Sequence, residues 1–243
     1  MRFGPLLPVL LLSAAWLGCG TADDAGSAAG SSTDSAVAGD AQARGNGAAG
    51  PQGPRVVFLG TSLTAGLGLA TPDDAYPARL QALADSAGVP ARMINVGESG
   101  ETSAGGLRRV GWVVADTVDV LVLELGANDG LRGQDTDALT RNLEAIIDTA
   151  RAHWPDAEVV LVGMEAPPNL GRPYTTAFHE VYLRVARERA TALVPFLLAG
   201  VAGDPALNQD DRIHPTAEGH EILAHNVWPV LEAAILRAAA RKG

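Results

Sequence analysis

The stretch that decides the fold runs from Val118 to Gly130 and reads VDVLVLELGANDG. Its first part is almost continuous valine and leucine, a pattern typical of a strand that is buried on both faces of a parallel sheet. Glycines and polar residues follow at once, so the chain turns where the strand ends. The stretch therefore predicts a buried strand that presents Asn128 just beyond its carboxyl end.

Four other short apolar runs complete a set of five predicted strands: Val56–Leu59, Met93–Val96, Val118–Leu123, Val159–Val162 and Leu193–Leu197. Segments with helical periodicity lie between or after them, at Tyr76–Ala87, Leu107–Val114, Thr136–His153, Thr175–Arg189 and Ala217–Arg241. Strands that alternate with helices at this spacing predict a parallel sheet between two helical layers. We therefore expect a three-layer α/β/α sandwich with a five-stranded parallel sheet, and functional groups at the carboxyl ends of its strands.

The first residues have the layout of a secretory signal, because Arg2 precedes the apolar run Leu6–Leu17, which is too short to span a bilayer. Residues 1–19 are therefore predicted to be a signal peptide. Its end is similar to a bacterial lipobox, in which the cysteine is lipidated and becomes the mature N-terminus, although Trp16 stands where leucine is usual. We expect an exported protein that is anchored to a bacterial membrane through Cys19 and faces the periplasm or cell surface. Without lipidation it would be secreted.

Residues 20–54 consist mainly of small and polar residues and contain almost no large apolar side chain. Such a segment cannot bury enough surface to offset its ordering entropy, so it is predicted to be a disordered tether. The folded domain is then expected over residues 55–243. The net charge of −10 and the lack of a basic patch argue against nucleic acid as a partner.

Two separate sites suggest nucleophilic catalysis. Ser62 follows the first predicted strand between Gly60 and Gly66, where a serine by itself is more often a helix cap. Asp211 and His214 lie three positions apart, just before the last predicted helix. Histidine is the usual base for a serine nucleophile near neutral pH, and an aspartate can bond its second ring nitrogen and stabilise the imidazolium.

Two further residues follow the second and third strands. Gly100 lies at a strand-to-helix junction, where its backbone N–H is unobstructed, and Asn128 lies in a glycine-flanked turn. Taken alone, each is more typical of an ordinary turn. Taken together, a serine, a glycine, an asparagine and an Asp-x-x-His at one rim of the sheet favour a serine hydrolase.

At this point a family resemblance becomes clear. Residues 56–228 resemble the SGNH (GDSL) hydrolases, in particular the bacterial thioesterase I, lysophospholipase and arylesterase group. Glu124–Gly133 (ELGANDGLRG) is similar to that group's third sequence block, Ser99–Ser103 (SGETS) to its second and Asp211–Pro215 (DRIHP) to its fifth. The eponymous Gly-Asp-Ser-Leu motif reads GTSL at Gly60–Leu63.

The resemblance implies a flavodoxin-like fold and an acyl-enzyme mechanism. It assigns Ser62 as the nucleophile, His214 as the base and Asp211 as the acid, because the family's Asp-x-x-His spacing selects Asp211 over Asp210. The implied oxyanion hole consists of Ser62 and Gly100 backbone N–H groups and the Asn128 amide. No metal or organic cofactor is implied.

The expected partner is a small acyl or aryl ester, with thioesters and lysophospholipids as further substrates. The segments Thr61–Pro77, Asp129–Gln134 and Glu165–Tyr174 should line the acyl pocket, which is expected to be apolar because of Leu131, Pro167, Pro168 and Leu170. Two alternatives remain open at this stage, since fold does not fix substrate. One is a carbohydrate O-acetyl esterase, and the other is a catalytically silent binding module.

Overall fold

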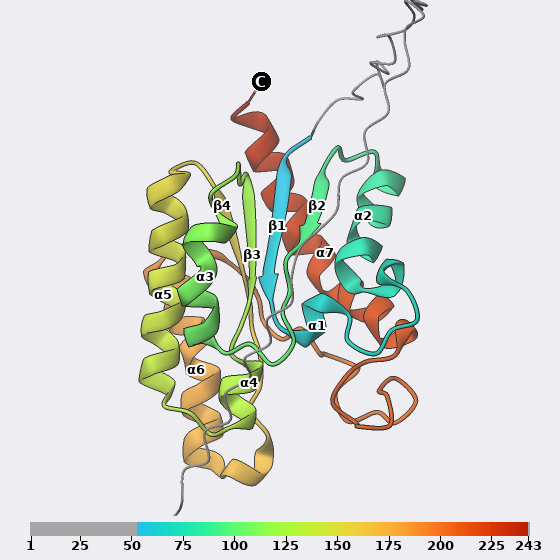
Figure 1. Cartoon of the computed structure of the whole chain (residues 1–243), viewed down its shortest axis with the longest axis vertical. Helices are drawn as coiled ribbons and strands as arrows, with labels where there is room; N and C mark the ends of the chain where they lie inside the picture. Colours follow the sequence, from blue (N-terminus) through green and yellow to red (C-terminus); the bar gives the residue numbers. More distant parts are fainter. Residues whose placement is uncertain (1–52, 243) are drawn as a thin grey trace, which may run out of the picture. The chain divides into compact units, whose positions relative to one another are not determined.

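The structure is a computed structural model that describes residues 53–242. Its strands are β1 (Arg55–Gly60), β2 (Arg92–Asn95), β3 (Val120–Glu124), β4 (Glu158–Val162) and β5 (Ala192–Val194). They form one parallel sheet in the order β2-β1-β3-β4-β5 (Figure 1). The chain leaves β1 toward β2 on one side and later places β3 on the other, so the topology switches between β1 and β3. Loops after these two strands are where a ligand site is expected.

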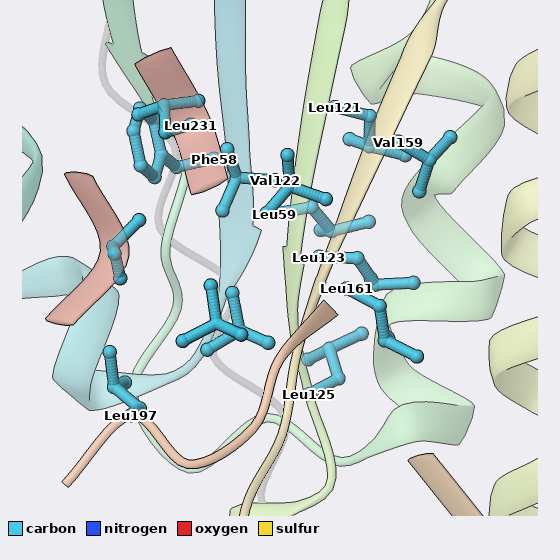
Figure 2. Packing of buried hydrophobic residues seen from close by; sticks show 14 of the residues in the cluster. Phe58, Leu59, Leu121, Val122, Leu123, Leu125, Val159, Leu161, Leu197 and Leu231 are labelled. Atoms are coloured by element: carbon cyan, nitrogen blue, oxygen red, sulfur yellow. The ribbon is translucent and has the colours of Figure 1, made fainter. Parts of the chain in front are cut away.

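The sheet is the centre of the hydrophobic core. Residues Val120–Leu123 of β3 are fully buried, and so are Phe58 and Leu59 of β1. Figure 2 shows Phe58, Leu59 and Leu121–Leu123 packed with Leu161 and with residues from the flanking elements. Burial on both faces explains why the run of valine and leucine has no polar alternation.

Helices cover both faces of the sheet (Figure 1). On one face lie α2 (Tyr76–Ala87) and α7 (Ala217–Ala240), and on the other lie α3 (Ser103–Val113), α5 (Thr136–His153) and α6 (Arg172–Glu188). The apolar stripe of α5 is buried as its periodicity predicts. The predicted three-layer α/β/α sandwich with a five-stranded parallel sheet is confirmed.

Several predicted element boundaries differ from the structure by one to four residues, and two of the differences have a clear local cause. The fifth strand ends at Val194 instead of Leu197, because Pro195 has no N–H with which to continue the ladder. The helix predicted from Leu107 begins four residues earlier, and the Thr102 side chain caps it by accepting the Gly105 N–H at 3.3 Å. The first turn of this helix contains serine and glycine, which give no apolar periodicity.

Two short helices that the sequence pattern did not predict follow the central strands directly. They are α1 (Ser62–Ala65) after β1 and α4 (Ala127–Leu131) after β3. Single 3-10 turns at Pro72–Asp74 and Pro168–Leu170 were also not predicted. Because α1 and α4 begin at the carboxyl edge of the sheet, they carry their side chains to the switch point.

The predicted signal peptide, Cys19 and nearly all of the predicted tether lie outside the described residues. Among the helices of residues 53–242, none has the length and apolar character that crossing a membrane requires.

Candidate active site

Ser62 is the first residue of α1 and follows β1 after a single residue. The Thr61 side chain caps this short helix by accepting the Leu63 N–H at 3.3 Å, and Gly66 ends it in a left-handed conformation with φ 78°. The N–H of a residue at the first helical position has no intrahelical acceptor, so the Ser62 N–H can serve a ligand. The local sequence thus presents both the hydroxyl and the amide of Ser62 at the sheet edge.

His214 connects Ser62 to Asp211. His214 Nε2 lies 2.8 Å from Ser62 Oγ, and His214 Nδ1 lies 2.6 Å from Asp211 Oδ2. The side-chain hydrogen bond with His214, followed by backbone N–H groups of His214 and Ile213, lowers the pKa of Asp211 to about 2. Asp211 is therefore an anion at neutral pH. An anionic acceptor places the ring proton on Nδ1 and leaves Nε2 able to accept the Ser62 proton.

The loop that carries His214 is tied to the loop after α1. The Gln209 N–H donates to the His214 carbonyl at 2.8 Å. The Gln209 side-chain amide donates to the carbonyls of Leu67 at 2.8 Å and Pro215 at 2.9 Å. In the same loop Arg212 has a left-handed backbone with φ 59°, which is uncommon for a residue other than glycine. Gln209 thereby links the histidine and serine segments, which are far apart in sequence.

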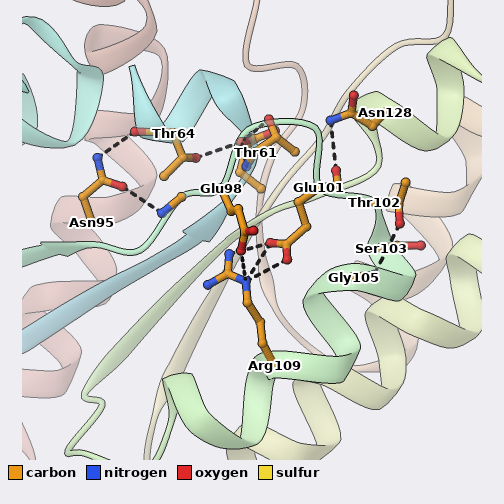
Figure 3. A network of polar contacts seen from close by, with 12 residues as sticks. Thr61, Thr64, Asn95, Glu98, Glu101, Thr102, Ser103, Gly105, Arg109 and Asn128 are labelled. Carbon is orange, nitrogen blue, oxygen red and sulfur yellow. Dashed lines mark hydrogen bonds and ion pairs between the residues drawn. The ribbon is translucent and has the colours of Figure 1, made fainter. Parts of the chain in front are cut away.

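Gly100 and Asn128 lie on neighbouring segments of the same rim. Gly100 is in a turn that the Glu101 N–H closes by donating to Glu98 at 3.3 Å, and its φ of 80° is the value that a type II turn requires at this position. Asn128 Nδ2 donates to the Glu101 carbonyl at 2.9 Å (Figure 3). Asn128 therefore joins the segment after β3 to the turn after β2.

Sequence reasoning missed two acidic residues that support this rim. Arg109 of α3 binds the Glu101 carboxylate through a bidentate ion pair, with Arg109 Nε 2.7 Å from Glu101 Oε1 (Figure 3). Asp129 is buried and accepts the N–H and the hydroxyl of Ser103 at 2.9 and 2.5 Å. Asp129 thus holds the first residue of α3, and Glu101 is bonded to a residue near the middle of the same helix. The i, i+8 spacing of Glu101 and Arg109 could not reveal the pair, because Glu101 precedes the helix.

A cavity of about 540 Å³ opens beside these groups. Ser62, Asn128 and His214 line it together with Glu165, Gly203, Asn208, Arg212 and a larger apolar set: Leu63, Ala127, Leu131, Met164, Ala166, Pro167, Pro168, Phe196, Leu198, Ala202 and Ile213. Leu131, Pro167 and Pro168 were predicted to line the pocket. Leu170 is not among the lining residues, and Phe196 and Leu198 were missed because they follow the fifth strand, where no lining segment was expected. Gly100 does not line this cavity.

The other histidines have local partners. His220 of α7 is buried, and its Nδ1 accepts the Tyr76 N–H at 3.2 Å. Burial lowers the pKa of His220 to about 4, so it is neutral and structural. His179 of α6 contacts Glu165 at 2.6 Å. Over residues 53–242, no three His, Cys, Asp or Glu side chains are grouped in a way that could hold a metal ion.

Comparison with known proteins identifies the family of the chain. Residues 58–222 match the GDSL-like lipase/acylhydrolase family. Esterase TesA of Pseudomonas aeruginosa is 43% identical over 178 residues, which cover 73% of this chain and 87% of that protein. An arylesterase of Vibrio mimicus is 33% identical over 71% of this chain and 86% of its own length. The crystal structure of TesA has a TM-score of 0.71 and 41% identity, and the match covers 74% of this chain and 99% of that one.

The chain therefore belongs to the GDSL-like lipase/acylhydrolase family, and it is a carboxylic ester hydrolase.

Proposed function

We propose that this chain cleaves esters by acyl transfer to Ser62, with His214 as the base and Asp211 as the residue that orients the base. One observation carries the proposal. An unbroken hydrogen-bonded chain runs from Ser62 Oγ through both His214 nitrogens to Asp211, with links of 2.8 and 2.6 Å, at the edge of an apolar cavity.

In the first step, His214 Nε2 takes the proton of Ser62 as Oγ attacks the carbonyl carbon. The carbonyl oxygen becomes an oxyanion, which the N–H groups of Ser62 and Gly100 and the free amide hydrogen of Asn128 would bind. Removal of one such donor typically costs about 3–4 kcal/mol in the transition state. The Asp211 carboxylate stabilises the imidazolium that forms at the same time.

In the second step, the His214 imidazolium gives its proton to the leaving alcohol, and an acyl-Ser62 ester remains. A water molecule then transfers a proton to His214 while its oxygen attacks the acyl carbon. The tetrahedral intermediate collapses as His214 returns this proton to Ser62 Oγ, which releases the carboxylic acid and regenerates free Ser62 and neutral His214, so the atoms and protons balance without a cofactor.

The substrates that we propose are esters with a medium-length acyl chain or an aryl group. The cavity supports this because leucine, proline, phenylalanine and methionine side chains form most of its walls, with Glu165, Asn208 and Arg212 at other positions. A largely apolar lining favours an apolar group over a hydrated sugar. A relative named arylesterase supports the same class. Thioesters and lysophospholipids share the acyl part of such substrates, while a carbohydrate acetyl ester would leave most of the cavity empty.

The test is a rate series over p-nitrophenyl esters from acetyl to dodecanoyl, run with wild type and Ser62→Ala. We expect kcat/KM to rise from acetyl to medium chains, and Ser62→Ala to lose at least about 10³-fold in kcat while its unfolding temperature is retained. Residual activity within tenfold of wild type would remove Ser62 from the mechanism. If kcat/KM is highest for the acetyl ester and acetylated sugars are hydrolysed, the carbohydrate O-acetyl esterase is favoured instead.

A further inference from the structure

Glu124, the last residue of β3, has a fully buried carboxyl group at the nucleophile turn. Its register partner in β1 is Gly60. A β-carbon at residue 60 would lie 2.7 Å from Glu124 Oε2 and 2.0 Å from Thr64 Oγ1. Only glycine therefore leaves room for the Glu124 side chain to reach the turn that follows β1.

The Glu124 carboxyl group accepts hydrogen bonds from residues on both sides of Ser62. Before it, the Thr61 N–H donates to Oε2 at 2.9 Å and the Thr61 hydroxyl donates to the same oxygen at 3.0 Å. After it, the Thr64 hydroxyl donates to Oε2 at 2.8 Å. Both threonines are fully buried, so water cannot replace these bonds.

The neighbouring groups can direct their protons toward Glu124. Thr61 Oγ1 already accepts the Leu63 N–H, which leaves its own hydrogen to donate. Thr64 Oγ1 lies 2.9 Å from the Tyr76 hydroxyl. Burial, together with the Glu124 charge, raises the pKa of Tyr76 well above its usual value, so Tyr76 keeps its proton and can donate it to Thr64. This pattern suits a carboxylate that acts only as an acceptor.

A buried, ionised carboxylate of this kind lowers the stability of the folded state. Burial raises the pKa of Glu124 to about 7, although the bonds from Thr61 and Thr64 lower it. Within the described residues, Glu124 has no ion pair that would offset its charge. A buried, unpaired charge normally destabilises a fold by several kcal/mol, and a group of this kind is most often found where it serves a site.

We propose that Glu124 is a positioning residue for Ser62, which it holds through Thr61 and Thr64 so that the serine Oγ faces His214. This inference rests on the proposed role of Ser62 as nucleophile. The Thr61 hydroxyl can donate to Glu124, whereas a second carboxylate there would repel it unless one of the two took up a proton.

The experiment measures how fast a fluorescent alkyl phosphonate labels the serine, together with kcat and KM for a medium-chain p-nitrophenyl ester. Four variants of the full chain are compared with wild type: Glu124→Gln, Thr61→Val, Thr61→Ser and Glu158→Gln. Glu158 is the first residue of β4 and lies at the amino end of the strands, away from Ser62. Glu158→Gln is therefore the matched control for loss of one carboxylate. Thr61→Val and Thr61→Ser separate the hydroxyl from the bulk of the side chain.

We expect Glu124→Gln and Thr61→Val to slow labelling and kcat at least about tenfold, with KM within about threefold of wild type. A purely structural role would not produce this split, because it would lower the amount of folded enzyme and leave the rate per labelled site unchanged. Thr61→Ser should retain most of the labelling rate and kcat that Thr61→Val loses, and Glu158→Gln should have the labelling rate and kcat of wild type.

Labelling and kcat of folded Glu124→Gln within twofold of wild type would overturn the inference. If Glu124→Gln does not fold, equal rates for Thr61→Val and Thr61→Ser would overturn it in the same way. If the proposed role of Ser62 is itself wrong, the label will attach at another residue. Wild type and Ser62→Ala would then be labelled equally, which distinguishes this outcome from a failure of the Glu124 inference.

Discussion

A single side chain, Asn128, serves both structure and chemistry at the rim of the cavity. One of its two amide hydrogens is committed to the Glu101 carbonyl at 2.9 Å, which fixes the plane of the amide. The second hydrogen has a position set by that plane, and Asn128 lines the cavity beside Ser62. A donor that is oriented in advance does not have to reorganise when negative charge develops, which is the condition for stabilising an oxyanion.

Replacement of Asn128 by alanine should therefore lower kcat by about 10²–10³, with a much smaller change in KM, because the lost bond forms mainly in the transition state. Steady-state kinetics on one medium-chain ester would measure both parameters. If KM rises while kcat is unchanged, Asn128 binds the ground-state substrate and the oxyanion role is wrong.

The ionisation of Glu124 should also affect stability. Burial raises the pKa of Glu124 from 4.5 to about 7 in the folded chain. The folded state thus keeps a proton that the unfolded state has lost, and the stability present below pH 4.5 is lost as the pH rises through about 7. The loss is on the order of 3 kcal/mol. Glu124→Gln does not titrate, so its unfolding free energy minus that of wild type should increase over this interval.

Urea unfolding at pH 5 and pH 8 would measure the difference. The lowered pKa of His220, which is caused mainly by burial, opposes this trend in the same interval, but it is present in both proteins and cancels. A difference that stays constant between the two pH values would mean that Glu124 does not titrate there.

At the scale of elements, α3 acts as a support for the turn that contains Gly100. Arg109, two turns into the helix, binds the Glu101 carboxylate through two nitrogens. The Glu101 carbonyl in turn fixes Asn128, so the ion pair and the oxyanion donors belong to one connected structure (Figure 3). A planar guanidinium suits this arrangement better than an ammonium group, because it meets both carboxylate oxygens at once.

Arg109→Lys should retain the charge but lose the two-pronged contact, and we expect kcat to fall about three- to tenfold with little change in KM. Arg109→Leu should have a larger effect, because it leaves a nearly buried carboxylate without a partner. We expect it to lower the free energy of unfolding by about 3–5 kcal/mol. Arg237→Lys is the matched control, since Arg237 pairs with Glu158 at the other end of the sheet. Equal kinetics for Arg109→Lys and Arg237→Lys would show that the ion pair does not support the site.

At the scale of the whole molecule, periodicity predicted the layers and the parallel sheet, but it does not specify the strand order β2-β1-β3-β4-β5. Helices α2 and α5 begin and end where their apolar stripes predict. The short helices α1 and α4 escaped prediction because each is too brief to show a period. Their positions depend on capping and on the strands before them, which are tertiary effects.

The candidate site could be predicted residue by residue only where a motif carried it. Ser62, Asp211 and His214 come together in the structure as the sequence blocks suggested. Glu124 could not be found in this way, because a glutamate after a buried strand has no local signal for a partner more than sixty residues earlier. Phe196 enters the cavity through the loop that follows Pro195, whose path no pattern specifies.

We propose that Cys19 is lipidated, because it follows an apolar run and precedes a polar segment rich in alanine, glycine and serine. A lipoprotein-type anchor with more than one acyl chain would hold the domain stably at a membrane, whereas a single chain binds only marginally. In a bacterial host, Cys19→Ser should therefore move esterase activity from the membrane fraction to the soluble fraction, or leave an unprocessed precursor.

The measurement is cell fractionation followed by an ester assay on each fraction, with Ser13→Ala as a matched control within the predicted signal peptide. Cys19→Ser should keep the wild-type kcat, because the residues of the site all lie beyond residue 60. Wild-type activity found entirely in the soluble fraction would refute lipidation. The ester-hydrolase assignment would stand in that case, since it depends on the site and the family alone.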